Sequence, residues 1–224
     1  MRVSFFWVVC FIFLTGVSSL RLEADNDFQS WQWLCLHLYQ NKGFKAHIYA
    51  DNRMADNVSQ EKLYIVGPRL HYRISDPISL GVGYLFLNIH DLNQDVWRNE
   101  HRGENELNFH FSFNEKLDFH QRNRFEWRWR ESRDQPGYRM RSRFQLRYKT
   151  DLGRLKSVYT NNEFFWDIDS NDYSENRAIP VGLQFQITPA LDFNLFYMIQ
   201  SLHSASARSW KSNHIFGTHL NFRF

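Results

Sequence analysis

The 224-residue chain has few of the features that stabilise small disulfide-bonded proteins or helical membrane proteins. It contains two cysteines, and Cys10 lies in an apolar segment at the start of the chain. Removal of that segment would leave Cys35 alone, which excludes an intramolecular disulfide framework. After residue 20, no apolar run approaches the roughly 20 residues that a transmembrane helix needs. If the remainder of the chain enters a membrane, it must therefore do so as strands.

The chain also lacks a strong charge of one sign. Its formal net charge is +3, and charged residues make up 23% of the sequence. This balance argues against the strongly basic surface that is typical of nucleic-acid-binding proteins. There is no glycine-rich phosphate loop, and the ten histidines are scattered without metal-ligand spacing. We therefore expect no nucleic-acid partner, no cofactor and no metal site.

The first residues have the features of a secretory signal peptide. Arg2 provides a short positive region, and an almost unbroken apolar run follows from Val3 to Leu14. Small residues then lead to a predicted cleavage site after Ser19, with Ala24 as the alternative. These features predict export through the Sec pathway. The expected division is a signal peptide at 1–19, a mature N-terminal segment at 20–27 and a barrel domain at 28–224.

Aromatic residues are plentiful, at 17% of the chain, and they alternate with polar residues over long stretches. Every second residue from Leu107 to Phe113 is apolar, and the residues between them are polar. The same alternation holds at 117–130 and 137–148. A period of two over such lengths indicates β-strands, because no helix repeats with that period. Less regular copies of the pattern occur at 44–51, 64–73, 192–200 and 216–224.

The alternating segments number eleven, and the first runs from Phe28 to Gln40. They span about 10 to 14 residues, which suits a tilted membrane crossing better than a typical globular strand. We predict an all-β fold, a transmembrane antiparallel up-and-down β-barrel of ten to twelve strands. An even number requires either that the segment from Trp31 to Tyr39 lies off the wall, which gives ten strands, or that one further strand exists, which gives twelve. Odd closure is the third alternative. Tight turns are expected near 41–43, 75–77, 114–116, 151–153 and 188–190, and longer polar loops near 55–61, 91–101, 131–137, 167–176 and 202–213.

The alternation also predicts which side chains face outward. Large aromatic residues near the strand ends fit interfacial girdles at the membrane surface. The opposite positions carry two arginine rows, at 122–130 and 139–147, which face each other across one hairpin and therefore need intervening carboxylates. This arrangement is either a salt-bridged filling of the barrel or a basic constriction that guides anionic solutes. The aromatic residues predicted to form the girdles are Trp127, Trp129, Tyr138, Tyr148, Trp166 and Tyr197. The predicted inward network is Glu104, Glu106, Arg122, Arg124, Glu126, Arg128, Arg139, Arg141, Arg143, Arg147 and Glu163.

The last residues resemble the C-terminal signal of outer-membrane barrels. The chain ends at Phe224, and Phe222 lies at the preceding position of the same face. This resemblance implies recognition by the barrel assembly machinery through the last strand. The other expected partners are outer-membrane lipid and lipopolysaccharide around a monomeric barrel in the bacterial outer membrane.

Several short motifs together resemble a known bacterial family. They are Trp31, Asp51-Asn52-Arg53, Gly81-Val82-Gly83-Tyr84, Glu104-Asn105-Glu106, the segment 122–128 and the segment 139–143. The family is catalogued as domain of unknown function 2490 and grouped with outer-membrane barrels. The resemblance covers about residues 28–224 and is strongest at 101–148; it implies a barrel in the outer membrane and no known activity. The sequence departs from the pattern at 177–180, where a bulge near Pro180 would return Arg177 to the inner face.

Three further features bear on function: a His-x-Ser pair, the alternative of a soluble fold, and an acidic stretch that could bind calcium. His110-Phe111-Ser112 is similar to the His-x-Ser pair of an outer-membrane lipid A deacylase, with Glu126 as the acid that would orient His110. Both residues lie on the charged, inward parity, so we expect no catalytic residues and no enzyme. A soluble secreted β-sandwich that binds a ligand is the second alternative. The acidic stretch 167–172 with Glu175 lacks the glycine and glutamate of an EF-hand and is expected to be a solvated extracellular loop.

Overall fold

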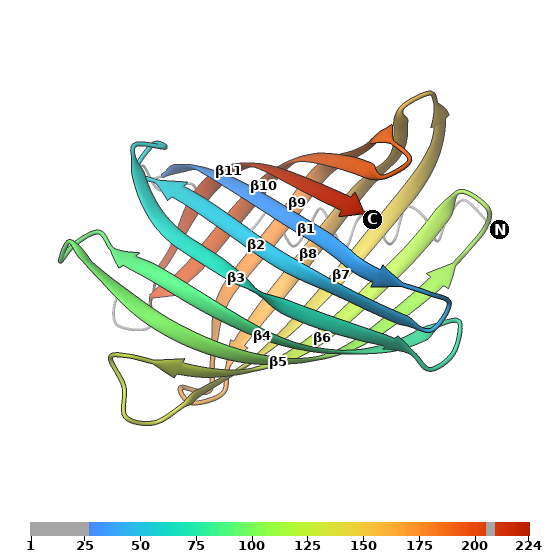
Figure 1. Ribbon diagram of the computed structural model, residues 1–224. Helices are drawn as coiled ribbons and strands as arrows, with labels where there is room; N and C mark the ends of the chain where they lie inside the picture. Colours follow the sequence, from blue (N-terminus) through green and yellow to red (C-terminus); the bar gives the residue numbers. More distant parts are fainter. Residues whose placement is uncertain (1–26, 205–208) are drawn as a thin grey trace.

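A computed structural model of the chain describes residues 27–204 and 209–224, and these form one closed β-barrel without helices (Figure 1). In the described part no helix is long and apolar enough to cross a membrane. The predicted signal peptide at 1–19 lies outside the described residues. The strands are β1 (Phe28–Gln40), β2 (Phe44–Ala55), β3 (Gln60–Arg73), β4 (Ile78–Asp91), β5 (Val96–Ser112), β6 (Leu117–Arg130), β7 (Gly137–Leu152), β8 (Leu155–Asp167), β9 (Asp172–Thr188), β10 (Leu191–Ser204) and β11 (Ser209–Arg223).

The barrel closes through a parallel pair between its first and last strands. Every other neighbouring pair is antiparallel, whereas β1 runs alongside β11 in register from Phe28↔His214 to His37↔Arg223. Figure 1 shows the arrowheads of these two strands pointing the same way. The described strands number eleven, within the predicted ten to twelve, and the segment Phe28–Gln40 is part of the wall. The predicted fully antiparallel order is wrong only at this seam, because an odd number of alternating strands makes the first and last run in the same direction.

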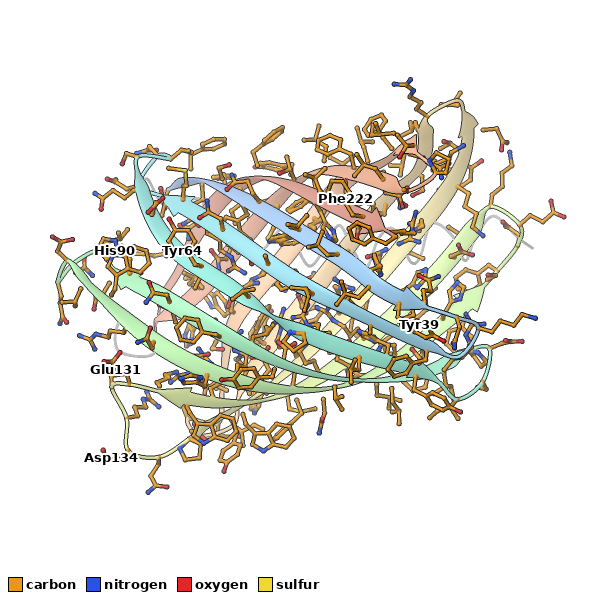
Figure 2. All side chains as sticks on the ribbon, viewed as in Figure 1. Tyr39, Tyr64, His90, Glu131, Asp134 and Phe222 are labelled. Carbon is orange, nitrogen blue, oxygen red and sulfur yellow. The ribbon has the colours of Figure 1, made fainter. Side chains whose placement is uncertain are left out.

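The connections define two ends of the barrel. The turn end carries the connections at 41–43, 74–77, 113–116, 153–154 and 189–190, and the loop end carries those at 56–59, 92–95, 131–136 and 168–171. In Figure 2, Tyr39 lies at the turn end, and Glu131 and Asp134 lie at the loop end. The long loops predicted at 91–101 and 167–176 are mostly strand, so that β5 and β9 each reach 17 residues. Polar composition misled the prediction there, because charged side chains of these strand ends point into the barrel.

The outer face is apolar and aromatic. In β5, β6 and β7, the positions that share a face with Trp127 hold no aspartate, glutamate, lysine or arginine. Exposed Trp97, Trp129 and Trp166 lie near the loop end, and exposed Tyr72 and Tyr148 lie near the turn end. Aromatic rings therefore flank the apolar surface on both sides. The closed sheet with charges inside contradicts the alternative of a β-sandwich, in which two sheets enclose an apolar core.

The inner face is divided between charged and apolar walls. Strands β5 to β8 contribute most of its arginines and glutamates, as predicted. The other strands add fewer charged side chains and two apolar clusters, of which Ile65, Leu85 and Leu87 form one on β3 and β4. A second cluster contains Trp31, Ile179, Phe196, Met198 and Ile215. The expectation of an arginine-rich interior is thus wrong for β4, which contains no arginine, whereas the strands around the seam combine inward arginines with the second apolar cluster.

Two glycines make room for aromatic rings inside the barrel. The ring of Phe196 lies against Gly217 of the neighbouring strand, so that a Cβ added there would approach within 2.0 Å of the ring. Tyr159 covers Gly182 in the same way, with a closest approach of 2.2 Å. Phe196 is buried in the cluster beside the seam. Both glycines are therefore required by packing, since neither has a positive φ angle.

We expect Gly217→Ala to destabilise the barrel by about 1–3 kcal/mol, because the added methyl group overpacks the inner wall. The measurement is the denaturant midpoint of heat-modifiable gel migration of the refolded protein. Thr218→Ala, at the adjacent outward position, is the matched control and should have a much smaller effect. Adding Phe196→Leu to Gly217→Ala should recover part of the loss. Equal effects of Gly217→Ala with and without Phe196→Leu would contradict the packing explanation.

Candidate functional site in the barrel lumen

Strand register places the two predicted arginine rows side by side. Across β6 and β7, Arg122 is paired with Arg143, and Arg124 is paired with Arg141. Across β5 and β6, Glu106 is paired with Arg124. These residues share the inner face, because side chains two positions apart on a strand point the same way. Glutamates of β5, β6 and β8 thus lie among the arginines and relieve the repulsion between the rows.

Glu126 is the centre of this network. Its side chain is fully buried and contacts Arg139 at 2.6 Å and Arg141 at 2.7 Å. Arg102 and Arg124 lie at 3.9 Å from the same carboxylate. A buried carboxylate is stable only when ion pairs and hydrogen bonds compensate its desolvation. The buried charge of Glu126 is therefore stabilised by these arginines, and their buried charges are stabilised by Glu126.

The other predicted glutamates each join two or more arginines. Glu163 contacts Arg122 at 2.6 Å and Arg141 at 3.1 Å. Glu104 contacts Arg69 at 2.8 Å and Arg124 at 3.0 Å, and Glu106 forms a close ion pair with Arg124. The structure thereby brings most of the predicted residues into one network. Its members from the predicted set are Glu104, Glu106, Arg122, Arg124, Glu126, Arg128, Arg139, Arg141 and Glu163.

Sequence reasoning missed several members of the network. Glu100 lies where a loop was predicted, yet it contacts Arg102 at 2.5 Å and Arg128 at 2.9 Å. Glu175 was assigned to a solvated loop, but it lies on the inner face of β9 and contacts Arg177 at 2.5 Å. The alternation at 100–106 and 175–177 carried the signal. The signal is weak at Glu100, because the outer positions His101, Gly103 and Asn105 are not apolar.

The bulge predicted near Pro180 is present. The pairing of β9 with β10 shifts between Val181 and Ala178, which returns Arg177 to the inner face. There the guanidinium of Arg177 lies 4.9 Å from the ring centroid of Trp31, and Arg53 covers the same ring at 3.7 Å. Such cation–π contacts hold charged side chains against apolar surface. Trp31 therefore joins the apolar cluster beside the seam to the charged network.

Arg143 and Arg147 differ from the other inward arginines. Neither forms an ion pair or a hydrogen bond with any residue in the described ranges. Both line a cavity of about 300 Å³ at the turn end and a cavity of about 560 Å³ deeper in the lumen. Arg122 and Gln145 also belong to both linings, so the two cavities meet at this group. We call Arg122, Arg143, Gln145 and Arg147 the lumen junction.

The larger cavity has one charged side and one apolar side. Arg102, Arg124 and Arg139 belong to its lining, and so do Leu85 and Met198 from the two apolar clusters. An arginine cluster beside a cavity favours anions, because guanidinium groups donate paired hydrogen bonds to carboxylate or phosphate oxygens. The apolar side favours hydrocarbon or aromatic groups. The chemistry of this site is therefore that of a small anion, either polar or amphipathic.

His110, Ser112 and Glu126 do not form the catalytic triad of a lipid hydrolase. The Ser112 hydroxyl donates a hydrogen bond to Asp118 at 2.8 Å, and His110 stacks on His120. Glu126 is paired with arginines and lies six residues along β6 from His120, about 20 Å away at the rise of a β-strand. His110 and Ser112 both face inward near the turn end. The geometry supports the expectation that they are lumen residues.

A family model described as "Protein of unknown function (DUF2490)" matches residues 28–211. The chain belongs to this family. An uncharacterised protein of Methylorubrum extorquens is 24% identical over 212 residues, which cover 91% of this chain and 92% of that protein. A chain solved in a study of the in-meso crystallization of membrane proteins matches with 13% identity and a TM-score of 0.40, over 85% of this chain and 74% of that one. That score is too low to carry an argument.

We expect Glu126→Gln to destabilise this DUF2490 barrel by about 3–5 kcal/mol, because it removes the close counter-charge of buried Arg139 and one of the two that hold Arg141. The readout is the urea midpoint of the folded band on unheated gels. Asp151→Asn is the matched control: Asp151 contacts Lys116 at 2.7 Å at the turn end, where both are exposed and the hydrogen bond raises the pKa of Lys116. The control should leave the midpoint unchanged, since exposed pairs contribute little. A Glu126→Gln barrel as stable as the wild type would show that the network is not stabilising.

Proposed function

We propose that this protein is an outer-membrane β-barrel that serves as a narrow pore for small anionic solutes. The observation that carries the proposal is the lumen junction, where Arg143 and Arg147 have no carboxylate within ion-pair distance in the described ranges and line two adjoining cavities. A guanidinium without a fixed counter-ion beside a cavity attracts anions from solution. The paired arginines elsewhere narrow the lumen and keep it rigid.

The membrane location is supported by the outer face of the barrel. An apolar band bounded by aromatic residues at both ends is the surface of a protein surrounded by lipid. We assign the turn end to the periplasm and the loop end to the cell exterior, as is usual for bacterial barrels. The expected export signal at 1–19 agrees with this assignment. The surrounding partners are then outer-membrane lipid and lipopolysaccharide, and the barrel acts as a monomer.

Assembly through the last strand is part of the same proposal. Phe224 is exposed immediately after β11, and Phe222, two residues before it, points outward. These two residues would be read by the barrel assembly machinery, with the final strand as the contact.

A sealed, purely structural barrel is the second candidate. It is favoured because many lumen arginines are already neutralised by ion pairs with Glu100, Glu104, Glu126 and Glu163. Barrels of about eight strands are filled by side chains, and water-filled channels are found at about sixteen strands. With eleven strands, conductance decides between the two candidates.

The location is tested by fractionating cells and comparing heated with unheated samples on gels. We expect the protein in the detergent-extracted outer-membrane fraction, with a folded band that shifts on heating. A fully exposed apolar girdle would aggregate in water, so detergent should be required throughout purification. Recovery of folded protein in plain buffer would contradict the membrane assignment.

The pore is tested in planar bilayers under a salt gradient. The wild type should pass a small, anion-selective current, and the Arg143→Gln/Arg147→Gln double variant should lose most of that selectivity. Arg154→Gln is the matched control, because Arg154 is exposed in the turn between β7 and β8. The control should keep wild-type selectivity. Absence of current from correctly folded wild-type protein would reject the pore and favour the sealed barrel.

A further inference from the structure

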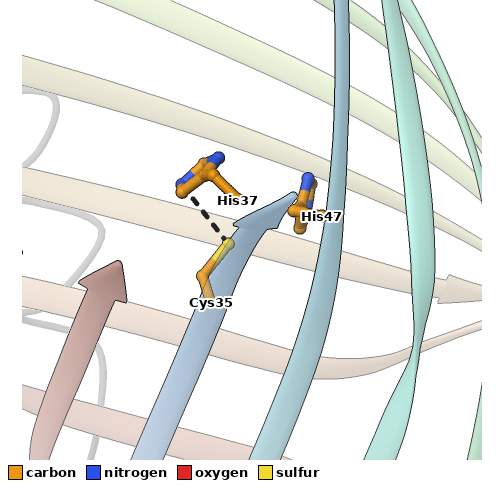
Figure 3. Close-up of side chains that lie close together, drawn as sticks. All are labelled: Cys35, His37 and His47. Atoms are coloured by element: carbon orange, nitrogen blue, oxygen red, sulfur yellow. Dashed lines mark hydrogen bonds between the residues drawn. The ribbon is translucent and has the colours of Figure 1, made fainter. Parts of the chain in front are cut away.

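Three potential metal ligands meet on the inner wall next to the seam. Cys35 and His37 are two positions apart on β1, and His47 lies directly opposite His37 on β2. Each contributes one ligand atom, and these atoms all lie within 4.8 Å of one another. Figure 3 shows the two imidazole rings on adjacent strands, with the Cys35 sulfur beside His37. We call Cys35, His37 and His47 the Cys–His cluster.

The distances within the cluster fit a tetrahedral metal ion. Cys35 Sγ lies 3.5 Å from His37 Nε2. In a tetrahedral zinc site, with metal–sulfur and metal–nitrogen bonds of about 2.3 and 2.0–2.1 Å, those two ligand atoms are about 3.6 Å apart. The rings of His37 and His47 have centroids 5.5 Å apart, so both can turn a nitrogen toward the same point. An ion could therefore bind without a change of strand register.

The cluster is accessible from the lumen. Cys35 and His47 both line the larger cavity, although Cys35 itself is buried. Protein ligands would fill three positions of a tetrahedron, and the fourth would open toward that cavity. Three protein ligands with one open position is the arrangement of zinc sites that bind water or a further ligand.

The charges that face the cluster permit a cation there. Arg223 of β11 lies opposite His37, but it forms an ion pair with Asp192. Arg69 of β3 forms an ion pair with Glu104 at 2.8 Å. His71 stacks on His47 and lies 3.8 Å from Glu106. Lys45 is the remaining cation nearby, at the turn end of β2 and exposed. A Cys35 thiolate would offset half the charge of a divalent ion.

A second group, His110, Asp118 and His120, has similar spacing but a different chemical state. Its carboxylate already accepts a hydrogen bond from Ser112 at 2.8 Å and contacts Lys149 at 3.0 Å. A cation there would have to displace Lys149. The Cys–His cluster has no such competitor, because no carboxylate or amine among the described residues contacts its three side chains within ion-pair distance.

We propose that the Cys–His cluster binds a zinc-class divalent cation on the inner wall of the barrel. Thiolate and imidazole are the ligands that select such ions over calcium and magnesium, which prefer oxygen. This site is independent of the proposed pore, because it uses none of the lumen-junction residues. The spacing of these residues in the sequence does not reveal the site, because the cluster forms only when the hairpin between β1 and β2 brings His47 opposite His37.

The test is titration of the detergent-folded protein with Co²⁺, whose absorption reports both sulfur ligation and geometry. The wild type should show a sulfur-to-cobalt charge-transfer band and intense tetrahedral bands that saturate at one equivalent, and added Zn²⁺ should remove them. Cys35→Ser should lose the charge-transfer band, and His47→Asn should weaken binding at least ~10-fold. Each variant is first checked for the heat-modifiable folded band, so that loss of binding is not loss of folding.

His110→Asn/His120→Asn is the matched control and should bind Co²⁺ like the wild type. Three results would overturn the assignment. One is a folded wild type without the charge-transfer band, and another is a Cys35→Ser variant that still shows it. The third is a band that Zn²⁺ does not displace.

Discussion

Charge balance inside a narrow barrel is the constraint on which the structure depends. A guanidinium or carboxylate removed from water is costly unless an opposite charge replaces the lost hydration. The inner wall meets this requirement by register: Glu126 on β6 reaches Arg139 and Arg141 on the next strand, and Glu163 approaches the same rows from β8. Because each carboxylate joins arginines of different strands, the network also fixes how those strands are aligned.

The apolar inner clusters fill the part of the interior that the charged rows do not occupy. The charged rows occupy β5 to β8, and the strands on the opposite side of the barrel fill their share of the interior with Trp31, Phe196, Leu85 and similar side chains. Aromatic rings connect the two halves, since Arg53 and Arg177 lie over Trp31, and Phe165 is contacted by three arginines. What remains open is a cavity with one basic side and one apolar side. That asymmetry comes from the fold itself and is the basis of the anion selectivity that we propose for the lumen.

Alternation in the sequence was sufficient to predict the central strands, their inward arginines and the bulge beside Pro180. It was sufficient because β5 to β7 keep a strict period of two, and one parity is unmistakably aromatic. The prediction failed where a strand end is polar on both faces, as at Glu100 and Glu175. It also failed to anticipate an apolar interior, because Leu85 and Leu87 alternate with residues that are equally apolar. The Cys–His cluster and the lumen junction depend on cross-strand register and on which arginines lack partners, neither of which a single sequence states.

The parallel seam has a kinetic consequence. Ten antiparallel pairs join strands that are consecutive in the chain, so each can form locally as a hairpin. The eleventh pair joins Phe28 to His214 and has no hairpin to bring it together. Its closure carries the largest loop entropy in the barrel and waits until the last strand is available. Until then both β1 and β11 present open edges, so we expect closure of this seam to be the last step of barrel formation and the one most sensitive to aggregation.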